Sequence, residues 1–140
     1  MSILSRCFNL MYQIYCDGAS RSNPGEASVG ISILKNNEEI DTIKKRIGIA
    51  TNNVAEYLGL IEALQYCIEK NIMNVVIYLD SLLVVQQVNL EYKVKSKKLQ
   101  EYYNQAIDLI NQINNIEINH VRREFNKRAD QLANQALDEL

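Results

Sequence analysis

The hydrophobic pattern of the chain changes its period near residue 53. Before that point the chain carries three segments with the pattern of strands, at 11–16, 28–34 and 40–49. Asn36 and Asn37 separate the second segment from the third, which predicts a hairpin between them. The stretch 19–26 consists almost entirely of Ser, Asn, Pro, Gly and charged residues, so it predicts a turn after the first strand.

From Asn53 onward the apolar residues recur at helical spacing. Tyr57, Ile61 and Leu64 lie three or four positions apart, which predicts an amphipathic helix over 53–70. Residues 74–79 (NVVIYL) are almost continuously apolar, as in a strand buried in a parallel sheet. The remaining segments are predicted as a short helix to about 88, a helix over 99–113, a strand over 116–121 and a closing helix over 126–140.

The resulting order, βββαβααβα, predicts a mixed α/β domain with a five-stranded sheet flanked by helices. The first three strands form a meander, and the crossover from the third strand to the fourth is expected to be right-handed. If the first, fourth and fifth strands pair in parallel, their carboxyl ends share one edge, where open α/β sheets bind ligands. Asp17 and Asp80 close the first and fourth strands, so we expect their carboxylates to lie side by side there.

The composition supports one folded domain. The chain has 140 residues, of which 47% are hydrophobic and 23% charged, enough apolar material to form a core. We expect a single domain over 12–140, preceded by an extension over 1–11. No apolar run reaches the roughly 18 residues of a membrane span, so no membrane association is expected.

Charge and metal-ligating residues limit the possible chemistry. The formal net charge of −2 gives no general attraction to nucleic acid, although cations gather at 44–46, 93–98 and 122–128. Such clusters are more often solvated faces, so they neither support nor exclude a polyanionic partner. Three cysteines without ligand spacing predict reduced thiols in a cytoplasmic protein. With one histidine, any metal is expected to have oxygen ligands.

Three acidic residues each have a structural interpretation beside a functional one. Asp17 begins an Asp-Gly pair, which is common in turns, and Asp80 can cap the helix that follows it. Glu56 lies three residues after Asn53, the spacing of a helix capping box. None of the three is specific by itself.

Asp130 lies on the same helix face as Ala133, so its side chain is expected to point toward the body of the protein. An acid beside an apolar face needs a partner, and Lys127 or a metal shared with Asp17 and Asp80 are the alternatives. Converging carboxylates favour the metal, because two of them about 4 Å apart repel by roughly 4 kcal/mol at an effective dielectric near 20.

The expected metal is Mg²⁺, with Mn²⁺ as a substitute, because hard cations prefer oxygen ligands. Two such ions a few ångströms apart suit in-line displacement at phosphorus, since they stabilise the attacking and leaving oxygens together. The acidic pattern therefore favours phosphodiester hydrolysis.

Four short motifs resemble those of type 1 ribonuclease H. They follow the family's order over nearly the whole chain, which makes the set far more specific than any one motif. They are Tyr15-Cys16-Asp17-Gly18-Ala19-Ser20 with Asn23-Pro24-Gly25, Thr51-Asn52-Asn53-Val54-Ala55-Glu56, Leu79-Asp80-Ser81, and Asn126-Lys127-Arg128-Ala129-Asp130. The resemblance implies the RNase H-like fold.

The resemblance also implies an endonuclease that cuts the RNA strand of RNA/DNA hybrids and leaves 5′-phosphate and 3′-hydroxyl ends. It implies two Mg²⁺ ions held by four catalytic carboxylates, which match Asp17, Glu56, Asp80 and Asp130. Asp17 would bridge both ions, and Asp130 would help hold the ion that activates water. The positions that contact the hybrid match Asn23, Thr51, Asn52, Asn53 and Ser81. A monomer without an obligate protein partner is expected.

The chain departs from the best-known bacterial members in the region of their basic, Trp-containing protrusion. It has no Trp, and a short stretch with Lys93, Lys95, Lys97 and Lys98 occupies that region. This stretch is more similar to the archaeal and plant-type branch. It predicts weaker and more salt-sensitive substrate binding than in members with the protrusion.

His120 marks a second departure, because it lacks the glycine-rich loop that surrounds the bacterial histidine at this spacing. An auxiliary catalytic role and a structural role are equally open, and Arg122 or Arg123 are alternatives for the auxiliary role.

Two other functions compete with the hybrid nuclease. One is a non-catalytic binding module of the same fold, which the retention of four mutually repelling acids argues against. The other is a different nuclease or polynucleotide transferase, such as a domain associated with a reverse transcriptase. The chain length favours a free-standing enzyme over that second alternative.

Overall fold

The computed structural model describes residues 12–139, and the extension expected over 1–11 lies outside them. The strands are β1 (Tyr12–Ser20), β2 (Gly25–Lys35), β3 (Glu38–Ala50), β4 (Asn74–Leu79) and β5 (Asn115–His120). The helices are α2 (Asn52–Glu69), α3 (Leu82–Val88), α4 (Lys97–Ile110) and α5 (Lys127–Asp138), with a short 3-10 helix, η1 (Arg123–Phe125), before α5.

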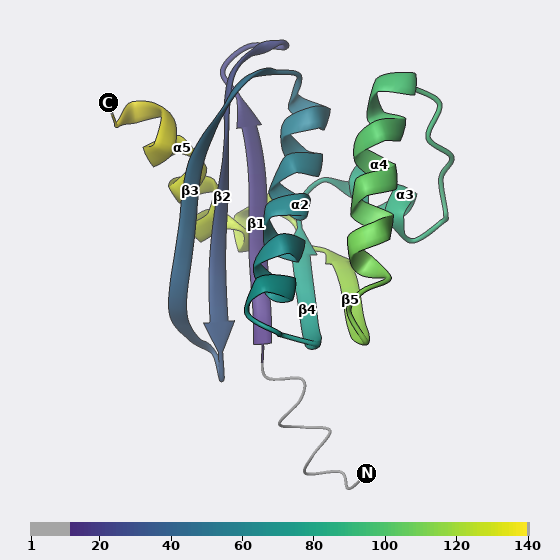
Figure 1. Ribbon diagram of the computed structural model, residues 1–140. Helices are drawn as coiled ribbons and strands as arrows, with labels where there is room; N and C mark the ends of the chain where they lie inside the picture. The colour runs from purple at the N-terminus through teal and green to yellow at the C-terminus, as the bar shows by residue number, and fades with distance from the viewer. Residues whose placement is uncertain (1–11, 140) are drawn as a thin grey trace, which may run out of the picture.

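The strands form one mixed sheet in the order β3-β2-β1-β4-β5. β1 pairs antiparallel with β2 and parallel with β4, and β4 pairs parallel with β5. The carboxyl ends of β1 and β4 therefore lie at the same end of the sheet, where α2 begins (Figure 1). The predicted α/β fold with a five-stranded mixed sheet is confirmed.

The first strand is longer than predicted, because its pairing with β2 continues beyond the residue at which its pairing with β4 ends. The β1–β4 ladder ends at Cys16, opposite Leu79. On its other side β1 stays paired with β2 as far as Ser20, opposite Ala27. Asp17 therefore lies inside β1, and the prediction that it closes the strand at a turn was wrong.

Two helix boundaries also differ from the predictions. The helix predicted over 99–113 spans Lys97–Ile110 instead, and the Ser96 hydroxyl caps it by accepting a hydrogen bond from the Leu99 amide at 3.3 Å. Ile113 lies beyond the helix, yet it is buried in the core. Ile113 is apolar because it packs in the core. Helical spacing alone cannot tell such a residue from one that lies inside the helix.

The sheet separates two layers of helices (Figure 1). α2 packs on β1 and against α4 on one face, and α5 packs on β2 and β1 on the other. The main core lies between α2 and the sheet, where fully buried side chains include Ile14, Tyr57, Leu60, Leu64 and Ile77. Within residues 12–139, no helix combines the length and the apolar character needed to cross a membrane.

Candidate active site

Three carboxylates from separate elements converge at the end of the sheet where α2 begins. Asp17 lies one residue beyond the β1–β4 ladder, Asp80 directly follows β4, and Glu56 projects from the second turn of α2. One oxygen atom of each carboxylate lies within 4.8 Å of the others. Asp17 and Glu56 are 6% and 5% exposed. This spacing is suited to a shared divalent cation, which oxygen ligands contact at about 2.0–2.6 Å.

Glu56 reaches the site because α2 approaches β1 without an intervening side chain. Its Oε1 accepts a hydrogen bond from the Gly18 amide at 2.9 Å. A side chain at Gly18 would overlap the Ala55 carbonyl. The N-cap of α2 is Thr51, whose hydroxyl accepts from the Val54 amide at 3.3 Å. The capping-box interpretation of Glu56 was therefore wrong.

Asp80 does not cap α3 either. That position belongs to Ser81, whose hydroxyl accepts a hydrogen bond from the Val84 amide at 3.3 Å. Asp80 Oδ2 instead accepts from the Asn126 side-chain amide at 3.0 Å. With turn and cap excluded, neither Asp17 nor Asp80 retains the structural role that its local sequence suggested.

Asp130 lies in the first turn of α5 and is half-buried beside the three-acid group. Its carboxylate raises the pKa of Asp17, although it does not belong to the group within 4.8 Å. Among the described residues, neither Asp130 nor Lys127 forms an ion pair. Lys127, the structural partner proposed for Asp130 from the sequence, therefore forms no ion pair with it.

The acids shift one another's pKa because they lie close together and Asp17 and Glu56 are buried. Burial, with the charges of Asp80 and Asp130, raises the pKa of Asp17 to about 7. Burial and the neighbouring Asp17 also raise the pKa of Glu56 well above its usual range. Glu56 Oε2 is buried without a hydrogen-bond partner. An unpaired buried oxygen in such a group fits a cation ligand, since a bound cation would satisfy it.

We predict that the metal-free protein becomes less stable as the pH rises from about 4 to about 7. The folded state holds the Asp17 proton to about pH 7, whereas the unfolded chain releases it near 3.8, so the folded state binds more protons in this window. In EDTA, the free energy of unfolding should fall by roughly 2–4 kcal/mol relative to Asp17→Asn between about pH 4 and 8. Urea unfolding measures this difference, and parallel pH profiles for the two proteins would contradict it.

The residues predicted to contact substrate surround this end of the sheet. The Asn23 side-chain oxygen accepts a hydrogen bond from the Asn52 amide at 3.0 Å, which ties the β1–β2 turn to the start of α2. Asn23, Asn52 and Asn53 are exposed. Thr51 and Ser81 are half-buried and are the N-caps of α2 and α3. Each of these two hydroxyls already accepts a hydrogen bond from the first turn of its helix.

His120 is the last residue of β5 and pairs with Leu79, next to Asp80. Its side chain is exposed. Arg122 and Arg123 are both exposed in the segment that follows, where Arg122 pairs with Glu124 at 3.3 Å. His120 therefore lies beside the segment that carries Asp80, and the auxiliary role of all three residues stays a prediction.

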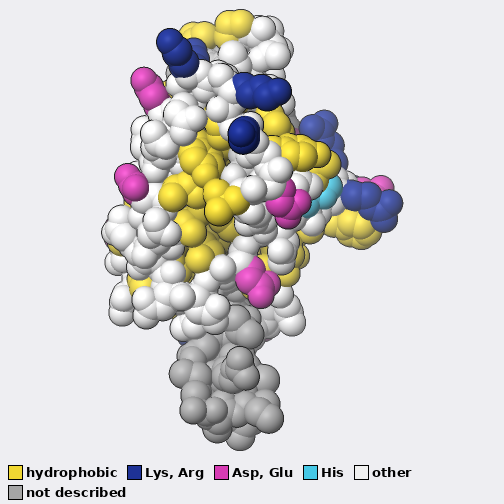
Figure 2. All heavy atoms as spheres, turned by 90° about the vertical axis from the view of Figure 1, so that its right-hand side faces the viewer, with side chains coloured by type: hydrophobic (Ala, Val, Ile, Leu, Met, Phe, Trp, Pro, Cys, Tyr) yellow, Lys and Arg dark blue, Asp and Glu magenta, His cyan; other side chains and the backbone are white. Residues whose placement is uncertain are grey.

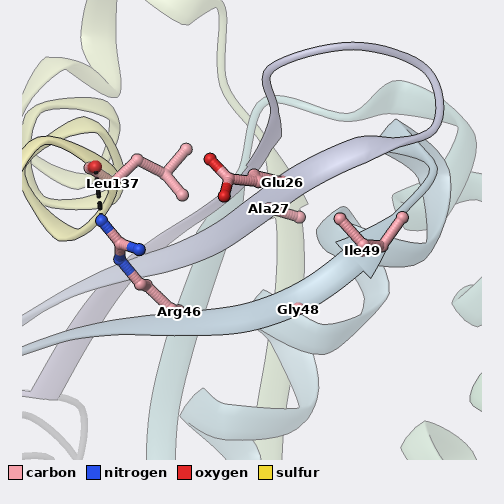
Figure 3. Close-up of a pocket in the computed structure, with 6 residues that line it drawn as sticks. All are labelled: Glu26, Ala27, Arg46, Gly48, Ile49 and Leu137. Carbon is pink, nitrogen blue, oxygen red and sulfur yellow. Dashed lines mark hydrogen bonds between the residues drawn. The ribbon is translucent and has the colours of Figure 1, made fainter.

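The cavity shown in Figure 3 lies away from the acids, between β2, β3 and the end of α5. It has a volume of about 120 Å³ and is lined by Glu26, Ala27, Arg46, Gly48, Ile49 and Leu137. Arg46 donates hydrogen bonds to the Ala136 and Leu137 carbonyls at 2.9 and 2.7 Å. It thereby satisfies the last turn of α5, which is a structural role.

Known proteins resemble the chain over most of its length. Residues 15–136 match the family model described as "Reverse transcriptase-like". A bifunctional protein of Mycobacterium tuberculosis is 40% identical over 127 residues, which cover 89% of this chain and 35% of that protein. The chain thus spans about a third of the length of its mycobacterial relatives. Ribonuclease HI of Halobacterium salinarum is 38% identical over 130 residues, covering 89% of this chain and 63% of that protein.

Solved structures match equally well. A crystal structure of RNase H1 from Halobacterium salinarum superimposes with a TM-score of 0.89 at 36% identity, covering 92% of this chain and 98% of that one. The structure of LC11-RNase H1 in complex with an RNA/DNA hybrid has a TM-score of 0.85 at 36% identity, covering 91% and 97%. The sheet order and the grouped acids thus define a protein of the RNase H-like class. Within that class, the chain belongs to the type 1 ribonuclease H family.

The site also contains features that the sequence motifs did not reveal. The Gly18 amide binds Glu56, and the Asn126 side chain binds Asp80. Both residues stand inside the quoted motifs, but their local sequence indicates only a turn and a helix start. Placement in the archaeal and plant-type branch stays a prediction.

Proposed function

We propose that this protein is an endoribonuclease that hydrolyses the RNA strand of RNA/DNA hybrids. The observation that carries the proposal is the convergence of Asp17, Glu56 and Asp80 within 4.8 Å in a member of the type 1 ribonuclease H family. The structure of LC11-RNase H1, 36% identical, was determined with an RNA/DNA hybrid. That hybrid supports the same substrate class for this chain.

Asp17, Glu56 and Asp80 would hold Mg²⁺, or Mn²⁺ as a substitute, and Asp130 would contribute to a second ion. The donor set consists of carboxylate oxygens, including the unpaired Glu56 Oε2, which suits hard cations. Bound metal supplies an activated water and stabilises negative charge at the scissile phosphate. Asp17 would take part in holding both ions, because all three other acids affect its pKa: Glu56 lowers it, whereas the charges of Asp80 and Asp130 raise it.

The proposed reaction adds water across the bond between phosphorus and the 3′ oxygen of the RNA. The water oxygen bonds to phosphorus, the phosphorus–3′-oxygen bond breaks, and a proton passes to the departing 3′ oxygen. The products carry a 5′-phosphate and a 3′-hydroxyl group. The chain's acids orient the phosphate and water, and His120, Arg122 or Arg123 would assist near the departing products.

Recognition of the hybrid is assigned to the polar residues around the acids. Asn23, Asn52, Asn53 and Ser81 would contact its minor groove, where 2′-hydroxyl groups distinguish RNA from DNA. Thr51 would contact a phosphate of the DNA strand. The hydrogen bond between Asn23 and the Asn52 amide holds two of these residues next to each other. We also propose a monomer that acts in the cytoplasm, consistent with the free thiols of Cys16 and Cys67.

The experiment that tests the function is cleavage of an end-labelled RNA/DNA hybrid with Mg²⁺, with double-stranded RNA and double-stranded DNA alongside. We expect cleavage confined to the RNA strand of the hybrid and abolished by EDTA. Equal cleavage of the other duplexes would favour a less selective nuclease. Binding without cleavage would favour a non-catalytic module and contradict the proposal.

We predict that hybrid affinity depends steeply on salt through Lys93 and Lys95. Both are exposed in the segment between α3 and α4, where they line a cavity of about 560 Å³. Figure 2 shows the face of the protein that carries α3, α4 and the segment between them. Lys and Arg side chains lie mainly in the upper half of this face, and apolar side chains lie at its centre. In Lys93→Ala/Lys95→Ala, the slope of log Kd against log salt should decrease by roughly 1 for each phosphate that the variant no longer neutralises.

The matched control is Lys70→Ala, because Lys70 caps the opposite end of α2 from Glu56. This variant should bind the hybrid with the wild-type salt slope. Fluorescence anisotropy over a series of salt concentrations measures both slopes. An unchanged slope in the double variant would show that this segment does not contact the hybrid.

A further inference from the structure

Asn126 is a buried side chain at the junction of the segments that carry the acids. It is 1% exposed and immediately precedes α5. Although it occupies the N-cap position, its side chain makes no capping hydrogen bond. The side-chain Nδ2 instead donates to the Cys16 carbonyl and to Asp80 Oδ2, each at 3.0 Å.

The main chain of Asn126 adds a third connection, because its carbonyl accepts a hydrogen bond from the Asp130 amide at 3.1 Å. Asn126 thus contacts the residue before Asp17, the carboxylate of Asp80 and the backbone of Asp130. These three acids come from β1, the segment after β4, and α5. A hydrogen bond is directional, so it can fix the orientation of the Asp80 carboxylate, which a hydrophobic contact cannot do.

The chemistry of the amide suits this position. An amide nitrogen carries two N–H donors, and here one can serve the Cys16 carbonyl while the other serves Asp80. The group is neutral, so it orients a carboxylate without cancelling the charge that attracts a cation. A lysine or arginine at the same place would instead compete with the metal for Asp80. The bond to the Cys16 carbonyl is buried and the bond to Asp80 is partly buried, which limits the access of water to them.

We propose that Asn126 is a positioning residue that holds the Asp80 carboxylate toward Asp17 for metal binding. This inference rests on the proposed function, since it assigns Asp80 to the metal site. Hydrogen-bond partners of metal-ligating side chains typically change metal affinity or activity by about 10–100-fold when they are removed. Asn126 would act through Asp80 and would not touch the substrate.

The test is direct Mn²⁺ binding to the Asn126→Ala variant, measured calorimetrically without nucleic acid. The Mn²⁺ dissociation constant should rise about 10–100-fold. The Mg²⁺ concentration for half-maximal hybrid cleavage should rise by a similar factor, with activity partly recovered at high Mg²⁺. If the variant melts at a lower temperature but binds Mn²⁺ as tightly as wild type, the role is structural only and the inference is wrong.

Asn89→Ala provides a matched control. The Asn89 side-chain amide donates to the Ile118 carbonyl at 2.9 Å, so it also binds a strand carbonyl but no acid. We expect this variant to lose stability while keeping the wild-type Mn²⁺ affinity. An equal loss of Mn²⁺ affinity in both variants would overturn the inference, because the effect would then follow from general destabilisation.

A second variant covers the case in which Asn126→Ala does not fold. Asn126→Ser keeps a small polar side chain with one hydroxyl donor at this buried position, so folding should be retained. A single short hydroxyl cannot serve both the Cys16 carbonyl and Asp80 as the amide does, so the Mn²⁺ dissociation constant should still rise; wild-type affinity would contradict the inference. Wild-type protein that binds Mn²⁺ but cleaves no hybrid would reject the proposed function, while the affinity difference would still decide the role of Asn126.

Discussion

Replacing Asp80 by Asn is expected to lower hybrid cleavage by about three orders of magnitude or more, while the metal-free protein becomes more stable. The loss of activity follows because metal ions contribute several kcal/mol to stabilising the transition state. The gain in stability follows because Asp80 raises the pKa of buried Asp17 by repulsion. Removing one charge should increase the free energy of unfolding by roughly 1–3 kcal/mol at about pH 8 without metal.

The opposite signs of these two effects make the prediction specific. Single-turnover cleavage in Mg²⁺ measures the first effect, and urea unfolding in EDTA measures the second. Asp108→Asn is the control, because Asp108 is an exposed acid on α4 and loses the same charge far from the site. It should change neither quantity appreciably. Asp80→Asn with near wild-type cleavage would contradict the proposed mechanism, and a loss of stability would contradict the electrostatic account of the site.

Replacing Gly30 by Ala is expected to destabilise the protein strongly. Gly30 lies on β2 beneath α5, and an added Cβ would overlap the Ala129 carbonyl and the Ala133 amide nitrogen. Both are backbone atoms of a helix, so the overlap can be relieved only by moving α5 away from the sheet. Overpacking of this kind destabilises by about 1–3 kcal/mol, and backbone overlap places this case at or above the upper end.

Moving α5 should also impair the site, because this helix carries Asp130 and follows directly after Asn126. Gly48→Ala is the control: its Cβ would meet no atom within 4 Å, but its positive φ of 83° disfavours a side chain. We expect a loss of about 1 kcal/mol there, with normal cleavage by the folded protein. Urea unfolding ranks the two variants, and a Gly30→Ala protein as stable as Gly48→Ala would contradict the packing account.

The sheet and the meeting of Asp17 with Asp80 could be predicted from the sequence because both depend on local signals that reinforce one another. Alternation identifies strands, an apolar run identifies the buried strand, and parallel pairing brings the carboxyl ends of β1 and β4 together. The end of β1 could not be predicted in the same way. It depends on β2 continuing to pair beyond the point where β4 ends.

The local roles of Glu56 and Asn126 were beyond sequence analysis for a related reason. The spacing between Asn53 and Glu56 fits a capping box, but the helix begins earlier, with Thr51 as its cap, and Glu56 turns to the Gly18 amide 38 residues away. Asn126 similarly precedes a helix, yet its side chain binds Cys16 and Asp80 across the fold. Each local motif competes with a long-range partner, and only the three-dimensional packing decides between them.

The central claim is that Asp17, Glu56 and Asp80 together bind a divalent cation. A crystal structure of the protein soaked in Mn²⁺, with anomalous scattering data, tests it most directly. We predict an anomalous peak within coordination distance of oxygens from all three carboxylates, and no such peak in Asp80→Asn. Carboxylates that diverge, or Mn²⁺ bound only elsewhere on the protein, would contradict the claim.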